Sequence, residues 1–220
     1  MTTGFHYEEP YDDRRQAGIE LAAHFGHLHG RDDIVVLALP RGGVPVAHEI
    51  ARTLNAPLDI LLVRKLGLPG HRELAMGAIA SGGVRVLNED VVSLYHVPVT
   101  IIDDIVRTEQ AELACRERAY RASRAPVLLR DRIVLLVDDG LATGSTMKAA
   151  VQAVQIHRPS RIIVAVPVGS PDSCRELAEI ADEVVCARTP EHFCAVGQWY
   201  RDFSEITDDE VHDLLRRSPS

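Results

Sequence analysis

Short apolar runs alternate with amphipathic stretches along this chain. Runs rich in Val, Ile and Leu, bounded by turn residues, predict buried strands at Asp33–Leu39, Leu58–Val63, Ile133–Val137, Ile162–Pro167 and Glu183–Ala187. The remaining periodic stretches predict helices at Asp12–Phe25, Val44–Leu54, Thr100–Arg124, from Pro171 to about Ile180, and from Thr207 into the Arg216–Ser220 tail. Alternating strands and helices are typical of an α/β fold with a mostly parallel central sheet flanked by helices.

One predicted hairpin interrupts this alternation. Residues Ala78–Leu87 hold Ser81-Gly82-Gly83 between two short apolar segments, and glycines favour tight β-hairpin turns. The sequence contains neither an internal repeat nor a linker long enough to divide two domains. We therefore expect residues 1–220 to form a single domain.

Composition narrows the class of protein. The 220 residues are 46% hydrophobic, enough for one sizeable domain. A net charge of −8 and a pI of about 5.7 argue against a nucleic-acid or anionic-membrane partner. Apolar runs fall short of the roughly 18 residues of a membrane span, and the polar, acidic segment Met1–Arg15 does not resemble a signal peptide.

Cysteine spacing points to a cytoplasmic protein. Cys115, Cys174, Cys186 and Cys194 contain no C-x-x-C pair, so the spacing indicates neither a zinc site nor a disulfide framework. Reduced thiols are the expectation for the cytoplasm. The ten histidines show no metal-binding spacing either, so we expect no metal held by protein ligands alone.

The most informative chemistry follows the predicted strand Ile133–Val137. Asp138 and Asp139 end that strand, and paired carboxylates can accept hydrogen bonds from vicinal sugar hydroxyls. A loop of small and hydroxylated residues then leads into a predicted helix at Met147. Such a loop offers backbone N–H groups, hydroxyls and a helix N-terminus to a phosphate. The loop residues are Gly140, Leu141, Ala142, Thr143, Gly144, Ser145 and Thr146.

A phosphate-binding loop accounts for this segment better than a Walker P-loop or a simple turn does. A Walker P-loop requires Gly-Lys-Ser/Thr, whereas Gly144 is followed by Ser145 without a lysine. A capped strand-to-helix turn with two solvated acids needs no ligand, but adjacent acids at a buried strand end repel each other. Ligand binding is therefore the favoured interpretation.

The segment resembles the 5-phosphoribosyl-1-pyrophosphate (PRPP) motif of the type I phosphoribosyltransferases. Its Asp-Asp-x-x-Ala-Thr-Gly-x-Thr form is most similar to that of the adenine phosphoribosyltransferases. The resemblance implies that Asp138 and Asp139 bind the ribose and that Ala142–Thr146 bind the 5′-phosphate. It also implies a core at about residues 33–170, with a hood formed by about residues 171–206 and the N-terminal segment.

A second anion-binding loop follows the strand Asp33–Leu39. Gly42 and Gly43 free the backbone to present N–H groups, and Arg41 adds a guanidinium suited to phosphate oxygens. In the resembling family a similar loop, often with a non-proline cis peptide, holds the pyrophosphate. The alternative is an ordinary glycine turn with a surface arginine.

Two further segments have implied roles. Arg64 and Lys65 resemble the family's pyrophosphate-contacting pair, and Gly67–Gly77 would be the flexible loop that closes over the site. A solvated basic pair beside a surface loop is the alternative. In the aromatic-rich segment 188–203, Trp199 and Tyr200 are candidates for contacting a base, or they complete a core.

The resemblance implies transfer of the phosphoribosyl group from PRPP to a nitrogenous base, with release of pyrophosphate. The charges that develop in this reaction would be stabilised by Mg²⁺ carried by PRPP and by four residues, namely Asp138, Asp139, Arg41 and Lys65. The implied partners are PRPP and a small-molecule acceptor, expected to be a nucleobase, and a homodimer is compatible with the family. Two alternatives remain open: a non-catalytic regulator that senses PRPP or nucleotides, and a generic phosphosugar-binding protein.

Overall fold

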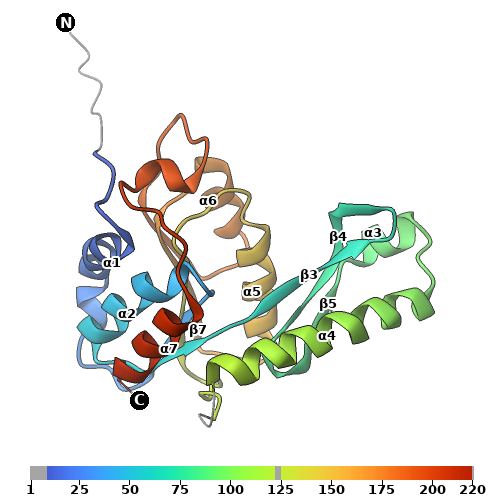
Figure 1. The fold of residues 1–220 in the computed structure, drawn as a ribbon, viewed down its shortest axis with the longest axis horizontal. Coiled ribbons are helices and arrows are strands. Elements are labelled where there is room, and N and C mark those ends of the chain that lie inside the picture. Colours follow the sequence, from blue (N-terminus) through green and yellow to red (C-terminus); the bar gives the residue numbers. More distant parts are fainter. Residues whose placement is uncertain (1–8, 122–124, 220) are drawn as a thin grey trace, which may run out of the picture.

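In the computed structural model, the described residues are 9–121 and 125–219, and their strands form two sheets (Figure 1). The larger sheet has five strands in the order β2-β1-β6-β7-β8, and every neighbouring pair is parallel. Its strands are β1 (Ile34–Ala38), β2 (Leu58–Ile60), β6 (Ile133–Val137), β7 (Arg161–Val168) and β8 (Glu183–Arg188). The predicted α/β class with a parallel central sheet is therefore confirmed.

Helices cover both faces of this sheet because its central strands are apolar on both sides. Along β1, Ile34 and Val36 pack into one core cluster and Val35 and Leu37 into the other, as the two-residue period of a strand requires. One face is covered by α1 (Arg14–Ala22), α2 (Gly43–Leu54) and α7 (Asp208–Arg217). The other is covered by α5 (Ser145–Gln155) and α6 (Pro171–Leu177) (Figure 1).

The second sheet is antiparallel and extends away from the first as an arm (Figure 1). Its strands are β3 (Val63–Leu68), β4 (His71–Ala80) and β5 (Val84–Leu87), followed by α3 (Glu89–Leu94) and α4 (Val99–Arg121). The predicted hairpin at Ala78–Leu87 is confirmed, since β4 pairs with β5 across Ser81–Gly83.

The predicted loop at Gly67–Gly77 is wrong as an assignment of secondary structure. Most of that segment belongs to β3 and β4, which pair with irregular register. Leu66, Leu68 and Met76 are fully buried in the cluster that also holds Ile102 and Val106 of α4. Packing against α4 therefore outweighs the glycine and proline content that suggested a loop.

Element boundaries differ from expectation in two further places. The first helix begins after Asp13, whose carboxylate accepts the Gln16 N–H, and it gives way to a 3-10 helix at Ala23–Leu28. Strand β2 stops at Ile60 rather than Val63, because Val63 already belongs to β3. No helix within residues 9–121 and 125–219 combines the length and apolar character needed to cross a membrane.

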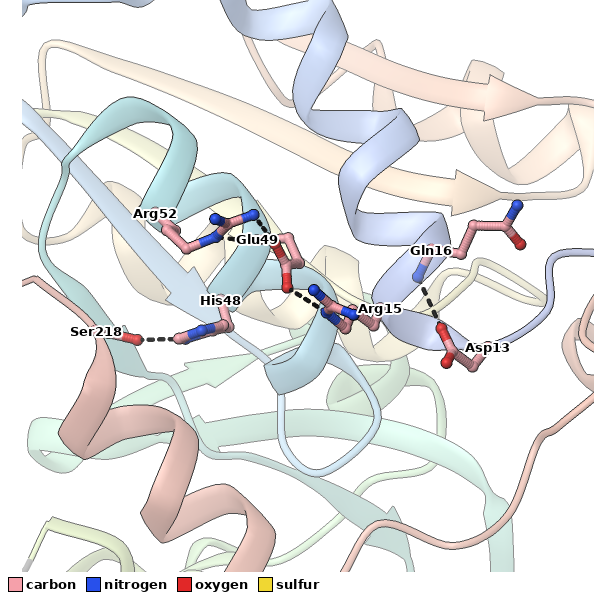
Figure 2. A network of polar contacts seen from close by, with 7 residues as sticks. All are labelled: Asp13, Arg15, Gln16, His48, Glu49, Arg52 and Ser218. Atoms are coloured by element: carbon pink, nitrogen blue, oxygen red, sulfur yellow. Dashed lines mark hydrogen bonds and ion pairs between the residues drawn. The ribbon is translucent and has the colours of Figure 1, made fainter.

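A buried carboxylate joins α1 to α2. Glu49 is 3% exposed, and its two oxygens accept hydrogen bonds from Arg15 Nε at 3.1 Å and Arg52 Nη2 at 2.6 Å (Figure 2). Ionised carboxylates are tolerated inside a protein only when they are paired in this way. The pairs fix α1 against the helix that begins at Gly43.

A histidine ties α2 to the chain that follows α7. His48 Nδ1 lies 2.8 Å from Ser218 Oγ, and that hydroxyl donates to the Leu214 carbonyl at 2.8 Å (Figure 2). The hydroxyl therefore accepts from His48, which places the ring proton on Nδ1. Burial lowers the pKa of His48, against a smaller opposing effect of the Glu49 charge.

The lowered pKa of His48 predicts a loss of stability in mild acid. The unfolded chain binds a proton at His48 from about pH 6.5 downward, whereas the folded protein takes it up only at lower pH. The melting temperature should therefore fall between about pH 7.5 and about pH 5.5, and fall less in His48→Gln. The matched control is His24→Gln at an exposed histidine. An unchanged pH dependence in His48→Gln would contradict the assignment.

Candidate functional site

The candidate site lies where the strand order reverses direction. β1 is followed by α2 on one face of the sheet, and β6 by α5 on the other. In open parallel sheets such a reversal opens a crevice at the carboxyl ends of the two strands. The Leu39 N–H donates to the Val137 carbonyl at 2.9 Å, so the loops after β1 and β6 leave the sheet side by side.

These two loops touch so closely that only glycine fits between them. A Cβ on Gly42 would lie 2.0 Å from Asp139 Oδ2, and one on Gly43 would lie 2.6 Å from the Val137 carbonyl oxygen. Both distances are far inside van der Waals contact. The peptide bond between Pro40 and Arg41 is cis. The structure thus brings together the two loops that the sequence analysis singled out separately.

The two adjacent acids are accommodated in different ways. Burial and then the negative charge of Asp139 raise the pKa of Asp138 well above its usual range. A hydrogen bond from the Asp139 N–H to Asp138 Oδ1, at 2.9 Å, opposes that rise. Asp138 therefore keeps its proton to a higher pH than an ordinary aspartate.

Asp139 is paired with an arginine from the first helix. Arg14 Nε lies 2.8 Å from Asp139 Oδ2, and these side chains are 9% and 16% exposed. Arg14 Nη1 also donates to the Ser204 carbonyl at 2.8 Å, and its guanidinium carbon lies 4.0 Å from the centre of the Phe203 ring. Arg14 thus pairs with Asp139 and fixes its position.

The side chain of Tyr200 binds the backbone of Asp139. The Tyr200 hydroxyl donates to the Asp139 carbonyl at 2.6 Å, and burial raises the pKa of that phenol. Its ring is 5% exposed and packs against Tyr11 and Phe203, with ring centres 5.6 and 5.2 Å away. This packing agrees with the alternative that Tyr200 completes a core, and contact of its ring with a base stays a prediction. The Tyr200 side chain also positions Asp139.

Trp199 lies beside this aromatic cluster without being fully buried. It ends the 3-10 helix Val196–Trp199, and its carbonyl accepts the Tyr11 N–H at 2.8 Å. The N-terminal segment and the segment near residue 200 therefore pack on each other, as a hood would require. Contact of Trp199 with a base stays a prediction.

The loop after Asp139 ends at a helix N-terminus that can receive an anion. Gly144 adopts a positive φ of 67°, and no side chain within the described ranges caps α5. The first backbone N–H groups of an uncapped helix are free to donate to a ligand. Thr143 and Thr146 are exposed beside it, and Thr143 Oγ1 lies 3.0 Å from Ser145 Oγ. The opposite end of the loop is tightly packed, because a Cβ on Gly140 would meet Val196 Cγ1 at 2.4 Å.

Arg41 faces the C-terminal part of the chain. Its guanidinium forms an ion pair with Glu205 and lies 3.7 Å from Asp208 Oδ1. The Tyr120 hydroxyl donates to the same carboxylate at 2.6 Å, and burial followed by that bond raises the pKa of Tyr120 to about 12. To contact a pyrophosphate, Arg41 must exchange these carboxylates for phosphate oxygens.

Arg64 and Lys65 do not act as a pair, because neighbouring residues on a strand face opposite sides. Arg64 contacts α4, with Nε 2.5 Å from Glu109 Oε2 and Nη1 2.6 Å from Glu112 Oε1. Lys65 is exposed on the face that it shares with Val63, toward the cluster containing α5. A pyrophosphate contact by either residue stays a prediction.

Comparison with known proteins agrees with this geometry. A family model described as "Phosphoribosyl transferase domain" matches residues 11–202. The chain belongs to the phosphoribosyl transferase family.

A Mycobacterium tuberculosis H37Rv protein, named "Putative phosphoribosyl transferase Rv0571c", is 49% identical over 208 residues. That match covers 94% of this chain but only 47% of the relative, so this phosphoribosyl transferase chain spans about half the length of that protein. The "Bifunctional protein PyrR" of Deinococcus radiodurans is 34% identical over 142 residues, covering 63% of this chain and 70% of its own length. The crystal structure of TT1426 from Thermus thermophilus has a TM-score of 0.86 at 42% identity, covering 96% of this chain and 100% of that one.

The sequence analysis missed one member of this candidate site. Arg14 lies 125 positions before Asp139, and no spacing rule links two residues so far apart. Its helix resembles any other flanking helix in the sequence, so nothing local marks its guanidinium as buried. Within the described part of the chain, no group of three or more His, Cys, Asp or Glu side chains could hold a metal ion.

The different surroundings of the two acids predict opposite effects of neutralising them. Asp138→Asn removes a buried, repelled charge and should leave the free energy of unfolding at neutral pH unchanged or higher. Asp139→Asn leaves Arg14 without its carboxylate and should lower that free energy by about 2 kcal/mol. Urea unfolding of both variants measures this difference.

A matched cycle tests the cause. If the Arg14–Asp139 pair carries the effect, Asp139→Asn should cost much less in an Arg14→Gln background. Equal losses in Asp138→Asn and Asp139→Asn would contradict the asymmetry.

Proposed function

We propose that this protein is a phosphoribosyltransferase that moves the 5-phosphoribosyl group of PRPP to a nitrogenous base and releases pyrophosphate. The observation that carries the proposal is the contact of Gly42 and Gly43 with the Asp138–Asp139 pair, beside the uncapped N-terminus of α5. That contact supports the proposal, because it brings groups suited to pyrophosphate, ribose and phosphate next to one another at the ends of β1 and β6. The phosphosugar alternative would need only the acids and the phosphate loop.

The ribose and phosphate ends of PRPP have separate binding groups. Asp139, paired with Arg14, would accept hydrogen bonds from ribose hydroxyls, and Asp138 would add a second group that can accept or donate. The N–H groups that open α5, with the hydroxyls of Thr143 and Thr146, would hold the 5′-phosphate. Fixed donors and acceptors of this kind orient the sugar before reaction.

Pyrophosphate would lie against the loop Arg41–Gly43. Arg41 would supply positive charge there once it leaves Glu205 and Asp208, whereas the Gly43 N–H already donates to the Leu39 carbonyl at 3.1 Å. Lys65, exposed on the arm, is the other proposed contact.

The donor set also fits Mg²⁺ carried by the substrate. Asp139 is already paired with Arg14, so the protein offers too few carboxylates for a dedicated metal cage, whereas Mg²⁺ commonly binds through substrate phosphates and water. Bound in that way, Mg²⁺ would supply positive charge to the pyrophosphate oxygens. Asp138 would contact its hydration shell.

The proposed reaction breaks the bond between C1 of the ribose and the pyrophosphate oxygen, and forms one between C1 and a ring nitrogen. Positive charge develops on the ribose as the old bond breaks. The fixed carboxylate of Asp139 would favour that charge, while Arg41 would favour the charge on the departing oxygen. The chain's contribution is therefore mainly positioning and electrostatics.

A regulator that senses PRPP is the second candidate. The observation in its favour is that Arg41 pairs with Glu205 and Asp208, so ligand binding would release the segment that carries them. The name "Bifunctional protein PyrR" of some relatives also supports keeping a second function in view. A cytoplasmic location is part of the same proposal for either candidate.

The proposal predicts a ranking of ligands. PRPP with Mg²⁺ should bind with a dissociation constant of about 1 mM or tighter, and ribose 5-phosphate more weakly, because it lacks the group proposed to contact Arg41. Isothermal titration measures both, and a screen of nucleobases for pyrophosphate release then identifies the acceptor. Equal affinities would remove the pyrophosphate assignment. Tight PRPP binding without pyrophosphate release for any base would favour the regulator.

Adding one methyl group at Gly42 should weaken PRPP binding in a protein that still folds. Gly42→Ala places a Cβ 2.0 Å from Asp139 Oδ2, so the carboxylate must move, and PRPP affinity should fall by roughly tenfold or more. Gly26→Ala is the control, because a Cβ there meets nothing within 4 Å. Wild-type PRPP affinity in a folded Gly42→Ala variant would contradict the proposed site.

A further inference from the structure

Two cysteines outside the proposed binding groups face the same small space. Cys174 belongs to α6 and Cys186 to β8, and both thiols are partly buried. A Cβ built on Gly169 would lie 3.0 Å from the sulfur of each. The two sulfur atoms are therefore no more than about 6 Å apart, because both lie 3.0 Å from one point. Glycine leaves the space between them open.

The thiols also interact electrostatically. The neighbouring Cys186 thiol lowers the pKa of Cys174, while the Cys174 thiol together with burial raises the pKa of Cys186, whose Sγ donates to the Arg188 carbonyl at 3.2 Å. A thiol with a lowered pKa yields more thiolate, which is the form that attacks a disulfide. Cys174 thus has the character of an attacking thiol and Cys186 that of its neighbouring partner.

We propose that Cys174 and Cys186 form a reversible disulfide that weakens phosphate binding at the loop before α5. The disulfide itself is independent of the proposed function, whereas its effect on phosphate rests on that function. The oxidant is a low-molecular-weight disulfide such as oxidised glutathione. No such cross-link follows from the spacing of the cysteines in the sequence.

The exchange balances in two steps. The Cys174 thiolate attacks one sulfur of the oxidant, forming a mixed disulfide and expelling one thiolate, which takes up a proton. Cys186 then loses its proton and attacks the Cys174 sulfur, which expels the second thiolate. Two protein S–H bonds are replaced by one S–S bond, and the oxidant gains two electrons as two thiols.

Closing the bond draws the two sulfur atoms together, and we expect one of the two elements to shift with them. A disulfide needs the sulfurs about 2.05 Å apart, so they must approach from their present separation. Cys186 is paired with Val166 in the parallel ladder of the main sheet, which resists displacement. The helix α6 is short, Pro171–Leu177, and it is the element that should shift.

A shift of α6 would reach the phosphate loop directly. Ser170 caps this helix and Ser173 lies in its first turn, and their hydroxyls donate to the Ala142 carbonyl at 3.1 and 2.6 Å. The Ser170 N–H also donates to the Leu141 carbonyl at 2.9 Å. These bonds hold the loop in the shape that leads to Gly144 and α5. Oxidation should disturb them and so misplace the phosphate donors.

The test compares reduced and oxidised wild-type protein, using ribose 5-phosphate as the probe. Non-reducing peptide mass spectrometry after incubation with oxidised glutathione should show the Cys174–Cys186 cross-link. Titration should then give an affinity for ribose 5-phosphate roughly fivefold weaker or more, corresponding to one or two lost hydrogen bonds. A reductant should restore it.

Variants identify the cysteines responsible. Cys174→Ala and Cys186→Ala should each abolish the redox response, and either one suffices if the other does not fold. The matched control replaces the exposed Cys115 and Cys194 by alanine and should respond like wild type.

Three results would overturn the proposal. Absence of the cross-link, or a stable mixed disulfide at Cys174 alone, would show that the proposed disulfide does not form. A cross-link that leaves ribose 5-phosphate affinity unchanged removes its regulatory effect. Reduced protein that binds neither ribose 5-phosphate nor PRPP would instead refute the proposed function and with it the regulatory effect, while the cross-link is still decided by mass spectrometry.

Discussion

The ion pair between Arg14 and Asp139 is the interaction on which the candidate site depends. Two carboxylates follow each other at the enclosed end of β6, and both cannot ionise there without compensation. Arg14 Nε lies 2.8 Å from Asp139 Oδ2, and the pKa of Asp138 is raised. Two chemically equal residues thus differ in their surroundings: Asp139 is held by an ion pair, and Asp138 keeps its proton to a higher pH than an ordinary aspartate.

The segment from Tyr200 to Asp208 links the acidic and basic sides of the site. Tyr200 binds the Asp139 backbone, and the Ser204 carbonyl accepts from Arg14. A few residues later, Glu205 and Asp208 pair with Arg41. One stretch of chain therefore contacts both the proposed ribose side and the proposed pyrophosphate side. A ligand that recruits Arg41 would loosen the second half of this stretch, while Tyr200, buried among aromatic rings, stays in place.

The arm adds a second layer to this arrangement. Its strand β3 directs Arg64 toward glutamates of α4 and Lys65 toward the opposite face. α4 then supplies Tyr120, which binds the Asp208 carboxylate that pairs with Arg41. The arm and the C-terminal segment therefore meet at the basic loop, although they are far apart in the sequence.

The sequence alone determined the strands of the main sheet, the parallel α/β class and the two loops that end β1 and β6. These features are local: a run such as Ile133–Val137 is apolar on both faces, and glycines beside acids mark a turn wherever the chain folds. Tertiary structure alone decided the partner of Asp139, the structural role of Tyr200, the pairing of Gly67–Gly77 into a hairpin and the approach of Cys174 to Cys186. Each of these depends on which distant segments become neighbours. Burial, ion pairing and sulfur–sulfur contact depend on which residues lie close together in space. The residues adjacent in sequence do not specify those distances.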